Sequence, residues 1–179
     1  MGAKIKGAGS SQIEIEGVKQ LKDVSYNIMS DRIEAGTFLC IAAMNHSNII
    51  VKNIDEDHII PIIDKLEEAG CEIQIEDRQI QIKAPKKLKS VNIKTMPYPG
   101  FPTDLQSPVM AVLSTIEGES CIREMVFEDR YKAADQLRKM GARIRVQGNE
   151  AVICGVKTLH GAAVQAQELR GGASLILAA

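Results

Sequence analysis

Residues 69–82, which read AGCEIQIEDRQIQI, contain the pattern that decides the fold of this 179-residue chain. Isoleucines alternate with polar residues on both sides of a short polar link, and such period-two alternation is typical of a β-hairpin. Related pairs of runs occur near the start of the chain, at 1–5 and 13–15, and again at 140–144 and 152–154. We therefore predict three copies of one hairpin.

Helical and strand patterns precede the second and third hairpins. Apolar periodicity predicts helices over 37–44, 59–69, 105–113 and 130–140, and apolar runs predict strands over 49–51 and 121–122. Gly70 and Gly141 directly follow two of these helices, and glycine is common just after a helix C-terminus. The order helix, strand, helix, hairpin thus recurs about every 70 residues, which indicates an internal repeat.

The repeat predicts an α/β (α+β) fold made of repeated subdomains, about two complete and two partial, because helices must cover the apolar face of each sheet. Residues 1–22 supply only the closing hairpin of a unit, and residues 172–179 match residues 36–43 and then stop. We therefore expect a fragment of a longer protein, in which residues 23–30 form a linker. Strand edges left uncovered in this way also favour self-association.

Composition and charge exclude several classes of partner. Lys and Arg number 22 against 23 Asp and Glu, so the formal net charge is −1 and no strong field of one sign favours nucleic acid or a membrane surface. The apolar runs fall far short of the roughly 20 residues that a membrane span needs, and no signal-peptide pattern is present. We expect a cytoplasmic protein whose partner is a small molecule.

The cysteines and histidines suggest no metal chemistry. The four cysteines are widely spaced and form no CxxC pair: Cys40, Cys71, Cys121 and Cys154. Because each lies among apolar or strand-forming neighbours, we interpret all four as buried, reduced thiols. The three histidines show no metal-ligand spacing with them, so we predict no metal site.

The segment YPGFPTDLQ, residues 98–106, carries the first candidate site residue. Its two prolines stiffen the chain, and Thr103 followed by Gln106 predicts a capping box at the start of a helix. Asp104 then lies in the first helical turn, where the helix dipole favours a negative charge by about 0.3–1 kcal/mol. A carboxylate held in this way could serve as a general base, although an acid in a first turn is also ordinary helix stabilisation.

The repeat helps to separate these two interpretations of Asp104. At the equivalent positions the other units have Phe38 and Ser174, and neither side chain is acidic. The carboxylate is therefore peculiar to one unit, which favours a functional role.

A second candidate is Arg130, which follows the strand predicted at 121–122 and opens the helix predicted at 130–140. A cation is unfavourable at a helix N-terminus and needs an anion nearby. Arg130 could bind a carboxylate or phosphate through two hydrogen bonds, or it could pair with Glu128, Asp129 or another neighbouring acid.

Two weaker signals are also present. The run Glu168-Leu169-Arg170-Gly171-Gly172 places an acid and a base ahead of a helix start, and its glycines either let backbone amides approach an anion or only make the loop flexible. A basic run lies in the connection between the two full units and, because it has no interleaved aromatic residues, is interpreted as a solvated surface: Lys83, Lys86, Lys87, Lys89 and Lys94.

Five ordered motifs together resemble those of the enolpyruvyl transferases, and in particular the members whose acceptor is UDP-N-acetylglucosamine. The motifs are MGA at 1–3, DRIEAGT at 31–37, PGFPTDLQ at 99–106, VFEDR at 126–130 and LRGGASL at 169–175. The match therefore extends over almost the whole chain.

The resemblance implies a fold of two domains, each with three βαβαββ subdomains arranged as an inverse α/β barrel. It makes residues 1–22 the closing hairpin of the last subdomain of the first domain and residues 23–30 the hinge. Residues 31–179 are then most of the second domain, with repeats over 31–97 and 98–160 and the start of a third over 161–179.

The resemblance also implies a reaction, the first committed step of peptidoglycan synthesis. Such enzymes move the enolpyruvyl group of phosphoenolpyruvate to the 3′-hydroxyl of UDP-N-acetylglucosamine and release phosphate, without a cofactor. By the same resemblance Asp104 receives the hydroxyl proton, Val126 contacts the UDP-sugar, and Arg130 binds the carboxylate of phosphoenolpyruvate. Arg170 fits a substrate-binding motif without an assigned contact, and Glu168 replaces an aspartate of the family, so its role is open.

Three further expectations concern the activity of this chain and its alternative functions. The family's first-domain lysine and its loop with a reactive cysteine are missing, so we expect the chain alone to be inactive. The related shikimate-3-phosphate transferase is an alternative, disfavoured because Val126-Phe127 stands where that enzyme has a Lys-Glu pair. A truncated, non-catalytic binding or structural module is the other alternative.

Overall fold

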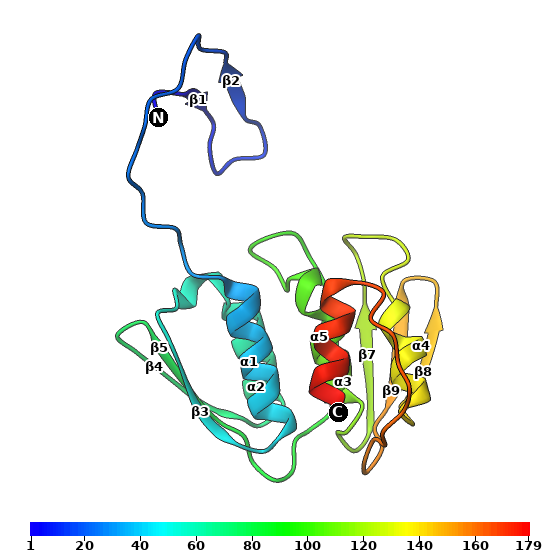
Figure 1. Ribbon diagram of the computed structural model, residues 1–179. Coiled ribbons are helices and arrows are strands. Elements are labelled where there is room, and N and C mark those ends of the chain that lie inside the picture. Colours follow the sequence, from blue (N-terminus) through cyan, green and yellow to red (C-terminus); the bar gives the residue numbers. More distant parts are fainter.

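A computed structural model describes residues 1–179 as an N-terminal hairpin joined by an extended segment to a larger body of helices and sheets (Figure 1). The strands are β1 Lys4–Lys6, β2 Glu14–Glu16, β3 Asn48–Lys52, β4 Glu72–Glu76, β5 Gln79–Lys83, β6 Ile93–Lys94, β7 Glu119–Arg123, β8 Arg143–Gln147 and β9 Glu150–Cys154. The α-helices are α1 Arg32–Met44, α2 Ile60–Glu68, α3 Gln106–Leu113, α4 Lys132–Lys139 and α5 Leu169–Ala178. Short 3₁₀ turns, η1 Glu56–His58 and η2 Thr103–Leu105, precede α2 and α3.

All three predicted hairpins are confirmed. β1 pairs with β2, β4 with β5 and β8 with β9, each pair antiparallel. In the central hairpin Asp77 and Arg78 both have positive φ, 46° and 58°. A two-residue turn with this geometry matches the right-handed twist of the flanking strands, which explains why two polar residues suffice to reverse the chain.

The helices and strands between the hairpins also occur in the predicted order, but several boundaries differ. α1 begins at Arg32, five residues before the predicted start, because the Asp31 carboxylate accepts hydrogen bonds from the amides of Ile33 and Glu34 and caps the helix there. α4 begins at Lys132, so Arg130 precedes this helix and does not open it.

The two full units build different sheets. In the first unit the strand order is β3-β5-β4, and β3 forms one edge. In the second unit the order is β6-β7-β9-β8, because β6 adds a short parallel strand beside β7. The extra strand delivers the chain directly into the segment YPGFPTDLQ that carries Asp104.

Three helices form the centre of the body. α1, α3 and α5 contact one another between the two sheets, as Figure 1 shows, while α2 lies against its own sheet and α4 contacts α5 as well as α3 and β8. α1 also packs closely on η2 at Gly36, where a Cβ atom would collide with the Leu105 side chain. The N-terminal ends of α1, α3 and α5 all lie at the end of the body that faces the hairpin (Figure 1).

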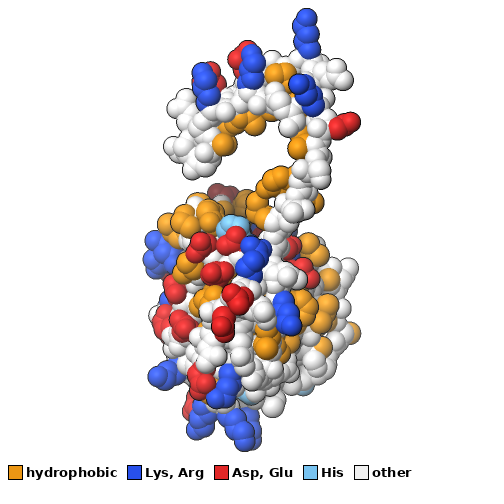
Figure 2. Space-filling view, turned by 90° about the vertical axis from the view of Figure 1, so that its left-hand side faces the viewer, with side chains coloured by type: hydrophobic (Ala, Val, Ile, Leu, Met, Phe, Trp, Pro, Cys, Tyr) orange, Lys and Arg blue, Asp and Glu red, His pale blue; other side chains and the backbone are white.

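The N-terminal hairpin makes little contact with the body. Its isoleucines Ile5, Ile13 and Ile15 are exposed, and hydrophobic side chains line the hairpin and the extended segment in Figure 2. None of the helices has the length and apolarity that a membrane crossing requires.

The prediction of four buried thiols is only partly right. Cys40 and Cys71 are buried, and burial raises the pKa of their thiols to about 12 and about 11. Cys121 is half-buried, and the prediction is wrong for Cys154, which is exposed at the end of β9. β9 lies between β7 and β8, and alternation along it buries Ile153 and turns Cys154 to the opposite, exposed face, so its apolar neighbours in the sequence do not cover it.

Candidate functional site

The carboxylate of Asp104 is the centre of a cluster of charged side chains. It lies in the 3₁₀ turn η2, which leads directly into α3. Its Oδ1 is 2.5 Å from Nη2 of Arg130, and its Oδ2 is 3.6 Å from Nη2 of Arg170. The structure therefore brings together three residues from three separate segments, each of which the sequence pattern singled out.

Arg130 reaches this cluster from the loop that follows β7. Asp129 has a positive φ of 51°, which turns the chain just before Arg130. The guanidinium lies over the ring of Phe127, with 5.1 Å between its carbon and the ring centroid, and pairs with Asp104 rather than with Glu128 or Asp129. An aromatic face on one side and a carboxylate at one edge fix the plane of the guanidinium.

Arg170 reaches the cluster from the first turn of α5. The helix begins at Leu169, so the two glycines that follow lie inside it and do not form the loop expected ahead of it. A Cβ on Gly171 would come within 3.1 Å of Cγ of Glu168, so this glycine leaves room for the Glu168 side chain. Glu168 is the N-cap residue of α5, but its side chain makes no capping hydrogen bond and its buried Oε1 has no hydrogen-bond partner.

The cluster carries net positive charge because two guanidiniums face one carboxylate. The side chains of Asp104, Arg130 and Arg170 retain 39%, 19% and 27% of their exposure, so the cluster is partly desolvated but open to solvent. Such a site can hold the carboxylate or phosphate of a ligand on the arginines and can present Asp104 to a ligand hydroxyl.

Val126, the fourth predicted residue, lies in the same loop but not in the ion-pair cluster. Its backbone amide donates a hydrogen bond of 2.9 Å to Oε1 of Glu124. The carbonyl oxygen is therefore the backbone group of Val126 that is left for a ligand contact.

Glu124 is a residue that the sequence patterns did not identify. It is only 2% exposed, and its carboxylate accepts hydrogen bonds from two threonine hydroxyls and two backbone amides. Ser120 and Ile122 are the buried residues of β7, so Glu124 occupies the next inward position. The signal was thus available, since an acid on the inward face of a strand must be paired.

The predicted capping box is wrong, and Glu124 is the reason. The hydroxyl of Thr103 donates to Oε2 of Glu124 at 2.9 Å and does not accept from the amide of Gln106. Because neither η2 nor α3 receives a side-chain cap, the Asp104 carboxylate is not used for helix capping.

Tyr131 holds the start of the loop that follows β7 through hydrogen bonds of its hydroxyl. Its hydroxyl lies 2.8 Å from the carbonyl oxygen of Ile122 and 2.9 Å from that of Asn149, and it accepts from the amide of Glu124 at 3.1 Å. Burial is the main reason that the pKa of this phenol rises to about 12. The neutral hydroxyl therefore persists across the physiological pH range and anchors the start of the loop.

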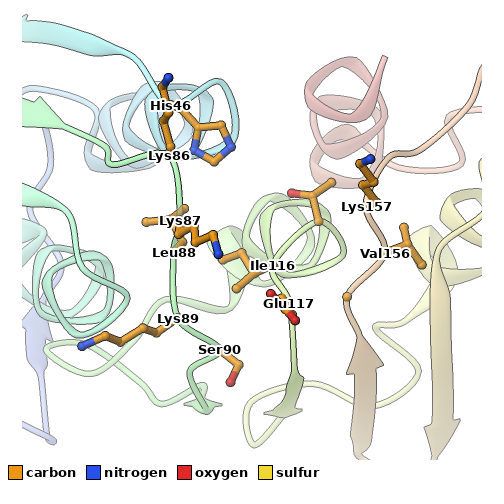
Figure 3. A pocket seen from close by; sticks show the side chains of 12 residues that line it. His46, Lys86, Lys87, Leu88, Lys89, Ser90, Ile116, Glu117, Val156 and Lys157 are labelled. Carbon is orange, nitrogen blue, oxygen red and sulfur yellow. The ribbon is translucent and has the colours of Figure 1, made fainter.

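A hollow of about 740 Å³ lies at the other end of the body, beyond the C-terminal ends of α1 and α3. Most of the predicted basic run lines it, together with His46, Glu117 and Lys157. Figure 3 shows that the ammonium groups of Lys86, Lys89 and Lys157 point in different directions and do not converge on one point. Lysines at helix C-termini complement the negative end of the helix dipole, so a solvated, helix-stabilising surface explains this region.

Comparison with known proteins identifies relatives along the whole chain. The family model described as EPSP synthase (3-phosphoshikimate 1-carboxyvinyltransferase) matches residues 1–179. A UDP-N-acetylglucosamine 1-carboxyvinyltransferase of Desulfofundulus thermocisternus is 49% identical over 179 residues, which cover 99% of this chain and 74% of that protein. The protein of the same name from Geotalea daltonii is 48% identical over 178 residues, covering 99% of this chain and 43% of that protein.

Solved structures show the same relationship. The enolpyruvyl transferase NikO from Streptomyces tendae matches with a TM-score of 0.83 at 26% identity, covering 99% of this chain and 43% of that chain. EPSP synthase from Acinetobacter baumannii matches in fold, with a TM-score of 0.71 at 20% identity over 99% of this chain and 44% of its own. The predicted fold class is thus confirmed, and the chain spans under half the length of most of these relatives.

Proposed function

The chain belongs to the EPSP synthase family of enolpyruvyl transferases, and on that premise we propose that it forms the acceptor-activating wall of a UDP-N-acetylglucosamine 1-carboxyvinyltransferase. The reaction would move the enolpyruvyl group of phosphoenolpyruvate to the sugar 3′-hydroxyl and release phosphate in the cytoplasm. Several relatives with this name are 48–50% identical over 99% of the chain, which supports this acceptor over shikimate 3-phosphate.

The observation that carries the proposal is the convergence of Asp104, Arg130 and Arg170 from three segments. A surface ion pair made only for stability needs two partners, whereas here a second guanidinium leaves the cluster positive and able to take another anion. The phosphoenolpyruvate carboxylate would occupy the fork of Arg130 and displace Asp104 from it. Asp104 would then be free to accept a hydrogen bond from the sugar hydroxyl.

The proton balance gives Asp104 its role. The 3′-oxygen forms a bond to C2 of phosphoenolpyruvate while Asp104 receives the hydroxyl proton and C3 gains a proton from solvent. Return of a C3 proton to solvent then restores the double bond as the C2–O bond to phosphate breaks. Help from a general base of this kind is typically worth about 10² to 10⁴ in rate.

The domain assignment follows the same family pattern. We propose that residues 1–22 close the last subdomain of the first domain, that residues 23–30 are the hinge, and that residues 31–179 are most of the second domain. The exposed isoleucines of the hairpin support this, because they need a cover that the remainder of the first domain would supply. The chain alone would cover them by self-association, and its mass in solution, measured by light scattering, tests that expectation.

A chimeric enzyme tests the proposed activity. Residues 1–179 would replace the matching segment of the Geotalea daltonii protein, which retains its own remaining sequence. We expect phosphate release with phosphoenolpyruvate and UDP-N-acetylglucosamine and none with shikimate 3-phosphate, with the parent enzyme as the control. Turnover with shikimate 3-phosphate instead would reassign the substrate, and a folded chimera without turnover would favour a non-catalytic module.

The 179-residue chain alone provides a second test of the proposed activity. We expect no phosphate release from residues 1–179 without a first domain, because one wall of the cleft and its reactive groups are missing. Turnover above that of buffer would contradict the assignment of the chain to one wall of a two-walled site.

A further inference from the structure

We propose that Glu124 is a positioning residue whose buried carboxylate sets the placement of Asp104 relative to Arg130. The inference concerns a residue outside the motifs that carry the family resemblance. It rests on the proposed function only for its catalytic consequence, since the geometric claim can be tested without turnover.

The first oxygen of the carboxylate holds the loop that carries Arg130. Oε1 of Glu124 accepts hydrogen bonds from the amides of Val126 at 2.9 Å and Phe127 at 3.2 Å. The Phe127 ring in turn lies against the guanidinium of Arg130. The carboxylate thus fixes the residue on which the arginine rests.

The second oxygen holds the turn that carries Asp104. Oε2 of Glu124 accepts from the hydroxyl of Thr103 at 2.9 Å, and Thr103 immediately precedes Asp104. A third segment is joined by Thr95, whose hydroxyl donates to Oε1 at 2.8 Å and accepts from the amide of Met125 at 2.9 Å. One side chain therefore connects the end of β6, the turn η2 and the loop after β7.

The chemistry of these contacts makes the connection specific. All four contacts to the carboxylate come from hydroxyls and backbone amides, and no ion pair involves Glu124. Oε1 accepts from three of these donors, whereas Oε2 accepts from the Thr103 hydroxyl alone. Loss of that hydroxyl would leave a buried oxygen without a partner, which movement of the attached segment would relieve.

Movement of either segment would act directly on the candidate site. The Asp104–Arg130 contact is 2.5 Å, and it joins the two segments that Glu124 holds. A misplacement of about 1 Å in an active site can lower the rate about 10²-fold. The role assigned to Glu124 is therefore exerted through other residues, since its own carboxylate is covered.

A measurement on the 179-residue chain tests the geometric claim. The guanidinium protons of Arg130 and the amides of Val126 and Phe127 can be followed by NMR hydrogen exchange in the wild type and in Thr103→Val. We expect slow exchange at all three places in the wild type and, in the variant, faster exchange of the Arg130 protons. Thr103→Ser is the matched control because it retains the hydroxyl, and its exchange should equal that of the wild type.

Substitutions of Glu124 itself complete the hydrogen-exchange measurement. Glu124→Gln keeps an oxygen for the two amides and should preserve their protection, whereas Glu124→Ala should remove it. If Glu124→Ala fails to fold, Thr103→Val still decides the question. Arg130 protons that exchange equally fast in the wild type, Thr103→Ser and Thr103→Val would overturn the proposal, whatever the enzyme activity.

Kinetics in the chimeric enzyme separate positioning from general stability. We expect Thr103→Val to lower kcat about 10-fold or more with KM for UDP-N-acetylglucosamine unchanged, and Thr103→Ser to stay within about twofold. In an Asp104→Asn background the same substitution should have no further effect, because its target is already lost. Independent, multiplicative losses in the double variant would show that Thr103 and Glu124 do not act through Asp104.

The two proposals fail in distinguishable ways. A chimera without turnover, together with exchange that depends on Thr103, refutes the proposed function and leaves the positioning geometry supported. A working chimera in which Thr103→Val equals the wild type in kcat and exchange refutes the role of Glu124 and leaves the proposed function supported.

Discussion

Two aspartates at the starts of equivalent helices show how the two units differ. In the first unit the Asp31 carboxylate accepts hydrogen bonds from the amides of Ile33 and Glu34, at 2.8 and 3.1 Å, and is used to cap α1. In the second unit Asp104 caps nothing and faces Arg130 and Arg170. The same residue type is structural in one unit and available for chemistry in the other.

The difference comes from how the chain enters each helix. The second unit has the additional strand β6 and the 3₁₀ turn η2, which keep the carboxylate away from the first amides of α3. Glu124 then anchors that turn through Thr103. In the first unit β3 is an edge strand, no strand lies between the N-terminal hairpin and α1, and the chain enters the helix directly through its capping aspartate. A repeated architecture thus supports a site where one copy has gained a strand.

The largest effect should separate the two aspartates by activity. Asp104→Asn in the chimeric enzyme should lower turnover about 10² to 10⁴-fold, because the amide cannot receive the hydroxyl proton. Asp31→Asn should leave turnover unchanged, since asparagine also caps helices. Phosphate release at saturating substrates measures both, and equal losses in the two variants would remove the distinction between the units.

The thiols provide a second contrast between the units. Cys40 and Cys71 of the first unit have pKa values raised by burial to about 12 and about 11, whereas Cys154 of the second is exposed. At pH 8 a thiol with a pKa of about 12 is ionised in only about one molecule in 10⁴, so it reacts very slowly. We expect a disulfide reagent to modify Cys154 first and the two buried thiols only after unfolding.

The same thiols predict how stability depends on pH. Because the folded-state pKa values of Cys40 and Cys71 lie above 9.0, their value when unburied, the folded state retains these protons more strongly than the unfolded state. Their contribution is therefore complete below about pH 9 and is lost as the pH rises towards 11 and 12. Urea denaturation should show a lower midpoint at pH 10 than at pH 8, and a Cys40→Ala variant should show a smaller decrease.

Much of this fold could be predicted from local patterns. The hairpins depend on period-two alternation within a few residues, as in 69–82. The antiparallel pairing of β4 with β5 joins residues that are close in sequence, so it needs no long-range information. Helix starts were less predictable. The helix expected from residue 37 begins at Arg32, because Asp31, which directly follows the predicted linker 23–30, caps it. The exposed Cys154 shows that apolar neighbours in sequence do not guarantee cover in space.

The site was predictable in its members but not in its contacts. Asp104, Arg130 and Arg170 each stood out by type and position, yet their pairing joins residues 26 or more apart and depends on how α3, α5 and the loop after β7 are packed. Glu124 escaped notice because it follows a strand without any motif. The alternation of β7 extends to it, but the structure is needed to show that this face points inward.

The packing between the units gives the next smaller effect. A methyl group on Gly36 would collide with the Leu105 side chain, so Gly36→Ala should lower the free energy of unfolding by about 1–3 kcal/mol. Adding Leu105→Val shortens the opposing side chain and should recover part of this loss. Urea denaturation of the 179-residue chain measures both. A neutral Gly36→Ala would mean that the units are not pressed together here and can move independently.

The smallest effect returns to the first aspartate. Asp31→Ala removes the acceptor for the amides of Ile33 and Glu34 and should lower the free energy of unfolding by about 1 kcal/mol, as loss of a helix cap usually does. Asp104→Ala should cost less stability, because its carboxylate satisfies no backbone amide and removing it only unpairs two partly solvated arginines. The two variants should thus rank in opposite order in urea denaturation and in phosphate release. If Asp104→Ala were the more destabilising of the two, the carboxylate would hold the second unit together as Asp31 holds the first, and its pairing with the arginines would no longer distinguish a site from a structural contact.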